Sequence, residues 1–170
     1  MELKDVVLVT LYVPNSGQKL ENFNQRVENW DTALREYTAN LETTTGKRVV
    51  VCGDLNVAHK DIDIYNYFAP HMEKTAGCTQ RERNSFSEWL SAGYIDALRH
   101  QYPDAKGLYT YWSVRAGNRG PNKGLRLDYF VCSNSMFEEE GKGVSVYDSF
   151  TMPDATSVSD HCPVGLVLKL

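Results

Sequence analysis

The sequence predicts an α/β (α+β) fold with mixed sheets, and three observations support this prediction. Apolar, β-branched segments typical of strands alternate with amphipathic segments typical of helices. The connections between the strands nearest the C-terminus are short, which favours a mixed sheet over a wholly parallel one. The length of 170 residues suits one domain with a substantial core, so residues 1–170 are assigned to a single domain.

The first part of the chain predicts a strand, a helix and a second strand. Residues 6–13 are apolar and β-branched, and the turn sequence Pro14-Asn15-Ser16-Gly17 follows them. Residues 20–41 indicate an amphipathic helix, because apolar side chains recur there at steps of three and four. These side chains are Phe23, Val27, Trp30, Leu34, Tyr37 and Leu41. Residues 48–52 are predicted to form a short strand that Gly53 stops.

The middle of the chain predicts an irregular segment over 62–70 and then helices. Residues 79–90 favour a helix, in which Thr79 is the N-cap and Glu82, three residues later, completes a capping box. Residues 94–100 are predicted to add a helical turn or two before Pro103.

The last part of the chain predicts strands separated by turns. Residues 108–114 alternate aromatic and polar side chains, as strands do. A loop over 115–124, which includes Gly117, Gly120 and Pro121, leads into a strand predicted at 125–132. Two more strands are predicted at 144–150 and 164–168.

Composition and charge exclude several classes of protein. The chain is 42% hydrophobic and 24% charged, which is ordinary for a globular protein. No apolar run is long enough to span a bilayer, and the first residues lack the basic region of a signal peptide, so no membrane partner is expected. The four cysteines lie far apart, which favours reduced thiols inside a cell.

The net charge of −4 argues against a protein that only coats nucleic acid. An enzyme that gathers carboxylates can nevertheless be acidic overall and keep one basic face. Residues 105–127 contain no acidic residue and five basic ones, and a solvated loop is the simpler explanation. The five are Lys106, Arg115, Arg119, Lys123 and Arg126.

Four segments place polar residues where a predicted strand meets a loop, which is where α/β folds assemble functional sites. They begin at Tyr12, Gly53, Leu127 and Ser159, and each has an ordinary structural explanation when it is considered by itself. Asp128 is the hardest to explain in that way, because a carboxylate in a half-buried strand needs a partner.

Together the four segments fit the hydrolysis of a phosphodiester. The reaction needs oxygen ligands for a hard cation, a group that activates water, and donors to the phosphate. Asp54 and Asp160 are candidates for the base and the metal ligand. Asn56 and His161 are candidate phosphate donors, and Asp128 is a candidate to fix the tautomer of a histidine.

The same segments resemble the exonuclease III family of abasic-site endonucleases, within the wider endonuclease/exonuclease/phosphatase superfamily. The matching stretches follow the order of the family over essentially the whole chain. GDLN and SDH recur across the superfamily, whereas YVPNSG, GDLNVAH and RLDYF are more specific to the abasic-site branch. The full stretches are LVTLYVPNSG, VVVCGDLNVAH, TAGCTQRERNSFSEWL, GLRLDYFVCS and SDHCPVGLVL.

The resemblance implies a four-layer α/β/β/α sandwich, in which two packed sheets are flanked by helices. It also implies Mg²⁺-dependent incision of double-stranded DNA 5′ to an abasic site, with Mn²⁺ as an alternative metal and some 3′-trimming activity. Such an enzyme of base excision repair is expected to act as a monomer. Its expected location is the nucleus, with the mitochondrion and the cytoplasm as alternatives.

Motif positions assign expected roles to residues of this chain. Tyr12 matches the tyrosine near the phosphate, and Asp54 matches the residue that activates water or protonates the leaving group. Asp128 and His161 match the Asp–His pair. The residues expected to contact the metal are Asp160, Asp54, Asn56 and His161, and Asn56 is also counted among the catalytic residues.

Further positions are expected to contact DNA. Tyr111, Leu125 and Leu127 match the lining of the pocket for the flipped-out sugar, and extrusion of a sugar without a base costs little stacking. Leu125 stands where some members have tryptophan, so the selectivity of the pocket is expected to differ. The remaining expected DNA contacts are Asn15, Arg115, Arg119, Lys123 and Arg126.

The family domain normally begins well before the strand predicted at 6–13, and that earlier part carries an asparagine and a metal-ligating glutamate. The 170 residues are therefore expected to be the C-terminal two-thirds of one such domain. We expect them to leave an apolar surface and a strand edge open, and to be weakly active or inactive by themselves.

Two other functions fit the same residues. One is a phosphatase of the same superfamily that acts on another phosphoester with Asp54, Asn56, Asp160 and His161. The other is a non-catalytic protein that binds DNA or a partner. The sequence RLDYF and the acid-free basic loop before it favour DNA as the substrate.

Overall fold

A computed structural model describes residues 1–138, 143–155 and 159–170. Its larger sheet has the strand order β1-β2-β4-β3, formed by β1 (Val6–Tyr12), β2 (Arg48–Asp54), β4 (Asp128–Ser133) and β3 (Tyr94–Asp96). β1 and β2 are parallel, whereas β4 is antiparallel to both of its neighbours. The predicted α/β fold with a mixed sheet is therefore confirmed.

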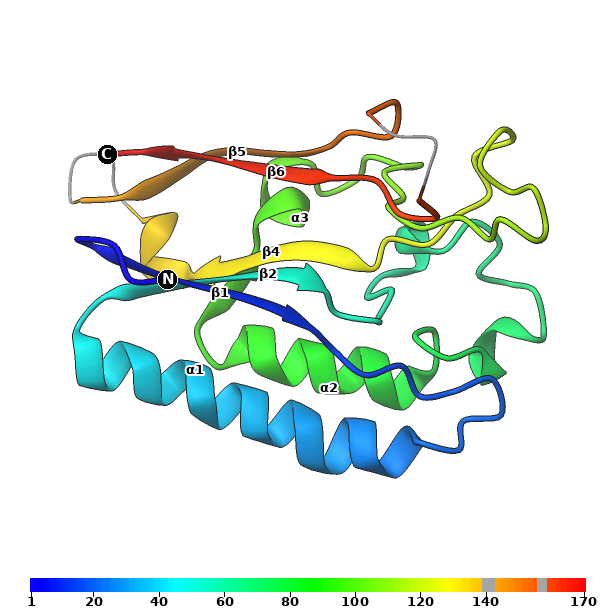
Figure 1. The fold of residues 1–170 in the computed structure, drawn as a ribbon, viewed down its shortest axis with the longest axis horizontal. Coiled ribbons are helices and arrows are strands. Elements are labelled where there is room, and N and C mark those ends of the chain that lie inside the picture. Colours follow the sequence, from blue (N-terminus) through cyan, green and yellow to red (C-terminus); the bar gives the residue numbers. More distant parts are fainter. Residues whose placement is uncertain (139–142, 156–158) are drawn as a thin grey trace.

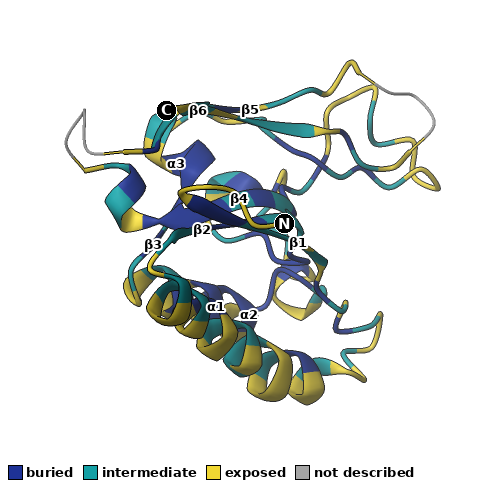
Figure 2. Ribbon diagram, turned by 60° about the vertical axis from the view of Figure 1, so that its left-hand side comes forward, coloured by how far each residue is buried: buried dark blue, intermediate teal, exposed yellow. Residues whose placement is uncertain are grey.

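A second sheet lies over the larger one and consists of β5 (Ser145–Thr151) and β6 (Val164–Lys169), which are antiparallel. On the opposite side, α1 (Asp31–Thr45) and α2 (Gln80–Ser91) cover the larger sheet (Figure 1, Figure 2). The short helix α3 (Ala97–Gln101) packs against β4 and β5. The described residues thus form three of the four expected layers, a helical layer and two sheets.

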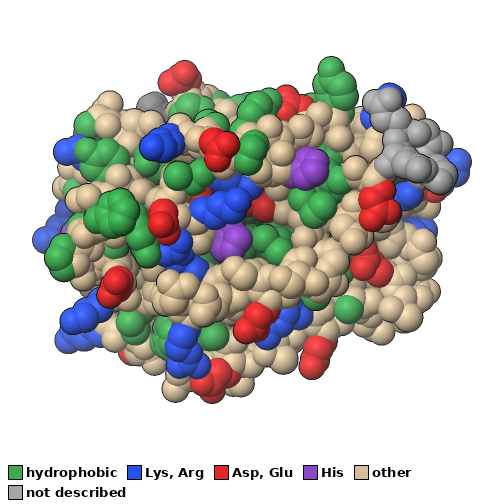
Figure 3. Space-filling view, turned by 180° about the vertical axis from the view of Figure 1, so that it is seen from behind, with side chains coloured by type: hydrophobic (Ala, Val, Ile, Leu, Met, Phe, Trp, Pro, Cys, Tyr) green, Lys and Arg blue, Asp and Glu red, His purple; other side chains and the backbone are tan. Residues whose placement is uncertain are grey.

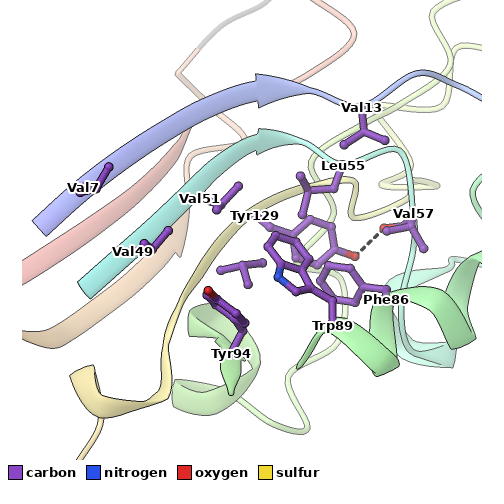
Figure 4. Close-up of a cluster of buried hydrophobic side chains, with 11 residues drawn as sticks. Val7, Val13, Val49, Val51, Leu55, Val57, Phe86, Trp89, Tyr94 and Tyr129 are labelled. Carbon is purple, nitrogen blue, oxygen red and sulfur yellow. Dashed lines mark hydrogen bonds between the residues drawn. The ribbon is translucent and has the colours of Figure 1, made fainter. Parts of the chain in front are cut away.

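Strand alternation divides the core between the two sides of the larger sheet. Val49 and Val51 of β2 face the helices, and they belong to the same buried cluster as Phe86 and Trp89, which Figure 4 shows. Val50, between them, faces the second sheet. This is the period-two pattern expected of a strand that is buried on both faces, and it fixes the larger sheet as the rigid centre of the domain.

The long helix begins later than the sequence predicts. A π-helical turn at Gln25–Trp30 leads into α1, which ends at Gly46 in a left-handed conformation with φ 65°. Residues 20–22 lie outside the helix, because Leu20 has φ 59° and its N–H donates to the carbonyl of Gly17, and helical structure begins at Phe23. Further along, Thr38 is fully buried and accepts a hydrogen bond from the indole of Trp89, which ties α1 to α2.

α2 confirms the predicted capping box. Thr79 accepts a hydrogen bond from the N–H of Glu82, and the Glu82 carboxylate accepts from the N–H of Thr79. Residues 94–100 agree only in part, because β3 precedes α3 there and Asp96 caps that helix. Short 3₁₀ turns lie at Asp61–Asp63, Met72–Lys74 and Asn134–Met136. The predicted irregular segment is otherwise free of regular structure.

Two strand predictions need correction. Residues 108–114 form no strand, and Tyr111 makes only isolated bridges to Leu125 and His161. The strand expected from residue 125 starts at Asp128 as β4, because Arg126 and Leu127 direct their backbone N–H groups to Asp63 and Thr110 instead of to a ladder. β5 and β6 lie within one residue of their predicted bounds.

The described part of the chain contains no helix that is long and apolar enough to cross a membrane. All four cysteines are unpaired in the structure, and three of them are buried.

The half-buried imidazole of His59 should make the fold sensitive to mild acid. Burial lowers the pKa of His59 to about 4, whereas an unfolded histidine titrates near 6.5. The unfolded chain therefore binds a proton first, and stability that is present above pH ~6.5 is lost as the pH falls towards 4. Urea unfolding should show that, between pH 7.5 and pH 5, the free energy of unfolding of His59→Gln falls by about 1–2 kcal/mol less than that of the parent chain.

The matched control for this prediction is His71→Gln, because His71 is exposed. Its loss of stability between the two pH values should equal that of the parent chain. An equal loss in the His59 and His71 variants would contradict the prediction.

Candidate active site

Three strands of the larger sheet bring polar side chains to one end. Asp54 is the last residue of β2, where it pairs with Tyr12 of β1 and with Asp128 of β4. Both carboxylates are 14% exposed, whereas the side chain of Tyr12 is 63% exposed. The sheet register therefore places the two predicted aspartates next to each other, with the tyrosine at the surface beside them.

Gly53 carries the strand to Asp54 rather than stopping it as predicted. Its φ is +135°, a backbone conformation that residues with a Cβ rarely adopt. A Cβ at this position would lie 2.0 Å from the carbonyl oxygen of Leu11 in the neighbouring strand. Glycine is therefore required for β1 and β2 to remain paired as far as Tyr12 and Asp54.

His161 lies between the two aspartates. Its Nδ1 is 2.7 Å from the Asp128 carboxylate, and its Nε2 is 3.9 Å from the Asp54 carboxylate. Nδ1–H donates to Asp128 in this arrangement, so Nε2 faces Asp54. The structure thus brings together three of the predicted catalytic residues from β2, β4 and the loop before β6.

The protein surroundings raise the pKa values of both Asp54 and His161. Burial raises the pKa of Asp54 to about 6, and the nearby charge of Asp128 adds to the effect. Burial opposes protonation of His161, but its hydrogen bond to Asp128 and the charges of the aspartates outweigh this and raise its pKa. Asp54 is therefore poised to exchange a proton near neutral pH, while His161 tends to stay protonated.

Asn56 is held at the edge of this group by its own amide. Its φ is 47°, and its side-chain NH₂ donates to the carbonyl of Val13 and to the Asp54 carboxylate. The carbonyl oxygen of its side chain accepts a hydrogen bond from Asn15 at 2.9 Å. These contacts give Asn56 and Asn15 a role in fixing the loops around Asp54.

The carboxylates are suited to a hard cation. Among the described residues, no three aspartate, glutamate, histidine or cysteine side chains are placed to hold a metal ion together. Magnesium commonly uses only one or two carboxylates and takes its other ligands from water and phosphate. Asp54 would serve as such a ligand, because a cation there would offset the burial that raises its pKa. Asp160, which is exposed, offers a second carboxylate beside His161.

A hollow of about 320 Å³ adjoins the site on the side of Tyr111. The ring of Tyr111 lies 5.1 Å from that of His161 and lines the hollow together with Leu125, Tyr65 and Met72. Two of the three residues predicted to line a sugar pocket are therefore at this position. Leu127 is not: it is 6% exposed and packs in the core cluster below, because its side chain points inwards at the start of β4.

The structure contradicts the prediction that Arg126 contacts DNA. Its side chain is fully buried, and its guanidinium forms ion pairs with Asp63 at 2.7 Å and with Asp96 at 2.6 Å. It also lies over the ring of Tyr129 at 4.2 Å. Arg99 binds Asp63 as well, at 2.6 Å. Arg126 is thus the centre of a buried ionic network and cannot reach a ligand.

The other basic residues of the predicted loop differ in their surroundings. Arg119 also acts within the protein: it donates to the carbonyls of Ser159 and His161 and lies 4.7 Å over the ring of Trp112. Arg115 and Lys123 are exposed. On the face that Figure 3 shows, acidic and basic side chains alternate rather than forming a field of one sign.

Sequence reasoning missed residues that support the site from behind. The buried hydroxyl of Thr110 accepts hydrogen bonds from the backbone at Asp128 and Leu127. The hydroxyl of Tyr129 donates to the carbonyl of Val57, as Figure 4 shows, and so holds the loop after Asp54. Tyr129 lies within RLDYF, which was a usable signal, whereas nothing local in the sequence marks Thr110.

Comparison with known proteins identifies the family. Residues 20–161 match the model of the Endonuclease/Exonuclease/phosphatase family. The chain is 42% identical to an exodeoxyribonuclease of Bacillus subtilis (strain 168), over 100% of this chain and 63% of that protein. It is 39% identical to a DNA-(apurinic or apyrimidinic site) endonuclease of Dictyostelium discoideum, over 100% of this chain and 45% of that protein.

A similar fold occurs in the crystal structure of the AP endonuclease LMAP from Leishmania major. The TM-score is 0.84 at 37% sequence identity, over 95% of this chain and 49% of that one. The chain therefore spans between 45% and 63% of the length of the relatives described. On the family match and this similarity, the chain belongs to the endonuclease/exonuclease/phosphatase family, and its similarity within that family is to exodeoxyribonucleases and AP endonucleases.

Proposed function

We propose that this site hydrolyses the DNA phosphodiester 5′ to an abasic site during base excision repair, and that it also trims 3′ ends. The observation that carries the proposal is the hydrogen bond of 2.7 Å between Asp128 and His161, which turns the other imidazole nitrogen towards Asp54. The similarity to proteins named as AP endonucleases and exodeoxyribonucleases favours DNA as the substrate.

Each group has a role that follows from its chemistry. His161, whose pKa is raised, donates from Nε2 to a non-bridging phosphate oxygen and so stabilises the charge that builds up there. Asp54, whose pKa is about 6, takes a proton from the attacking water or gives one to the leaving oxygen. Tyr12 lies at the exposed edge of the same group, and its proposed role is to contact the phosphate.

A divalent cation, Mg²⁺ or Mn²⁺, is part of the proposal. When bound, it would supply a Lewis acid that withdraws charge from the phosphate oxygens. Asp54 and Asp160 are the carboxylates that we expect to hold it, with Asn56 and His161 nearby. Their oxygen donors match the preference of hard cations.

The hollow beside Tyr111 and Leu125 is proposed to receive the flipped-out sugar. A residue without a base has little stacking to lose, so its extrusion from the duplex is cheap. Arg115 and Lys123 are exposed and remain the candidate phosphate contacts of the basic loop. We further propose that the enzyme acts as a monomer on double-stranded DNA in the nucleus.

The proposal is tested by cleavage of a duplex that contains one tetrahydrofuran abasic analogue. The chain is used in excess over DNA so that slow cutting by these 170 residues is detectable, and magnesium is compared with EDTA. We expect magnesium-dependent incision 5′ to the analogue, and a loss of roughly a hundredfold or more in Asp54→Ala. Asp5→Ala, at the opposite end of β1, is the matched control and should cut as the parent chain does.

Two other outcomes would replace the proposal. Hydrolysis of inositol phosphates with no cutting of DNA would make the site that of a phosphatase. Tight binding of abasic duplex that is insensitive to magnesium, with no cutting by folded protein, would make this chain a binding module.

A further inference from the structure

Thr110 lies between the strand that carries Asp128 and the loop that carries His161. Its side chain is entirely buried, at 0% exposure. Its hydroxyl oxygen accepts hydrogen bonds from the backbone N–H of Leu127 at 2.9 Å and of Asp128 at 3.0 Å. A hydroxyl has two acceptor lone pairs, so these two consecutive amides use both of them.

Two consecutive amides that converge on one oxygen depart from strand geometry. In a regular strand, successive N–H groups point to opposite edges of the strand. The backbone therefore turns at Leu127, and β4 starts at Asp128. Because the hydroxyl of Thr110 fixes the N–H of Asp128, it also fixes the direction in which the carboxylate of Asp128 leaves the backbone.

The main chain of Thr110 holds the other half of the pair. Its carbonyl oxygen accepts the N–H of Cys162 at 2.8 Å, and Cys162 follows His161 directly. The next residue, Tyr111, forms a backbone bridge with His161. One buried residue thus binds both segments whose side chains meet at 2.7 Å.

We infer that Thr110 is a positioning residue, whose hydroxyl holds Asp128 where its carboxylate accepts the Nδ1–H of His161. Thr110 lies behind Asp128 and acts through it. The consequence for cleavage rests on the proposed function. The tautomer of His161 is a property of the chain itself, so the inference about Thr110 and the proposed function can fail separately.

The test compares Thr110→Val with Thr110→Ser in two-bond ¹H–¹⁵N spectra of the histidine rings. Valine keeps the shape of threonine and removes the hydroxyl, whereas serine keeps the hydroxyl. At a pH where His161 is neutral, the parent chain and the serine variant should hold the proton on Nδ1. In the valine variant that population should fall at least about twofold, because the carboxylate no longer selects the tautomer. His161→Gln identifies the signals.

The cleavage assay adds a second readout. Thr110→Val should cut abasic duplex roughly tenfold to a hundredfold more slowly while binding it as the parent does, and Thr110→Ser should restore the rate. An unchanged tautomer in a folded valine variant would overturn the inference, whatever happens to cleavage. A changed tautomer in a chain that never cuts DNA would keep the inference and remove the proposed function.

Amide hydrogen exchange tests the same inference without the valine variant, should that variant not fold. The N–H groups of Leu127 and Asp128 should be protected in the parent chain and in Thr110→Ser, because both retain the acceptor. Exchange of these two amides as fast as that of exposed loop amides would overturn the inference.

Discussion

Replacing Arg126 with methionine should lower the free energy of unfolding by about 3–5 kcal/mol, because it removes one partner of a buried ionic network. Arg126 and Asp63 are both 0% exposed, and Asp96 is 4% exposed. The guanidinium donates twice to Asp63 and twice to Asp96. Methionine would fill much of the space. Within this network, the side chain of Asp63 would keep Arg99 as its cationic partner, and Asp96 would lose both hydrogen bonds from the Arg126 guanidinium.

The dependence on pH identifies the cause. Burial raises the pKa of Asp63, but Arg126 and Arg99 outweigh it and lower this pKa to about 2. Without Arg126, only Arg99 offsets the burial of Asp63, so the pKa of Asp63 should rise and protonation of Asp63 should stabilise the folded variant. The loss of stability should therefore be smaller at pH 5 than at pH 8.

Urea unfolding followed by circular dichroism measures both effects. Arg115→Met is the matched control, because Arg115 is exposed, and it should change the free energy of unfolding by less than about 0.5 kcal/mol. Equal, small losses in the two methionine variants would show that the network contributes nothing to stability.

Replacing Asp128 with asparagine should lower the rate of abasic-site incision by roughly 10²–10⁴-fold. Asparagine fits the same space but carries no charge, so it no longer raises the pKa of His161. His161 would lose its proton at a lower pH than in the parent chain, and the donor to phosphate would weaken near neutral pH. Binding of abasic DNA should change little, because the Asp128 carboxylate faces His161.

Single-turnover cleavage from pH 5.5 to pH 8.5 checks this prediction. Besides the lower rate, the limb of the profile that reports protonated His161 should move to lower pH. Asp104→Asn is the control, since Asp104 is exposed and lies outside the site. A variant that cuts at the parent rate would show that Asp128 does not support catalysis.

Features that depend on near neighbours could be predicted from the sequence. The capping box of α2 needs only Thr79 and Glu82, which are three residues apart, and the structure confirms it. Asp54 and His161 could be singled out because polar residues at strand ends are informative wherever the strands pair. That they meet, with His161 between Asp54 and Asp128, required the register of the sheet.

Features that depend on distant partners could not be predicted. Arg126 belongs to an acid-free stretch, and local charge therefore indicated a DNA contact. Its partners Asp63 and Asp96 are 63 and 30 residues away in the sequence, so nothing near Arg126 shows that it is neutralised. Gly53 was misread for the same reason, because the close approach of Leu11 comes from another strand.

The pairing of Asp54 with Asp128 in adjacent central strands has a consequence for how this domain moves and changes. The backbones that carry these carboxylates cannot separate unless hydrogen bonds between the two interior strands of the sheet break. The walls of the neighbouring hollow belong to connecting segments, which tolerate substitution and displacement more readily. Substitutions in these segments can therefore change which ligands fit the hollow, while Asp54 and Asp128 keep their relative positions.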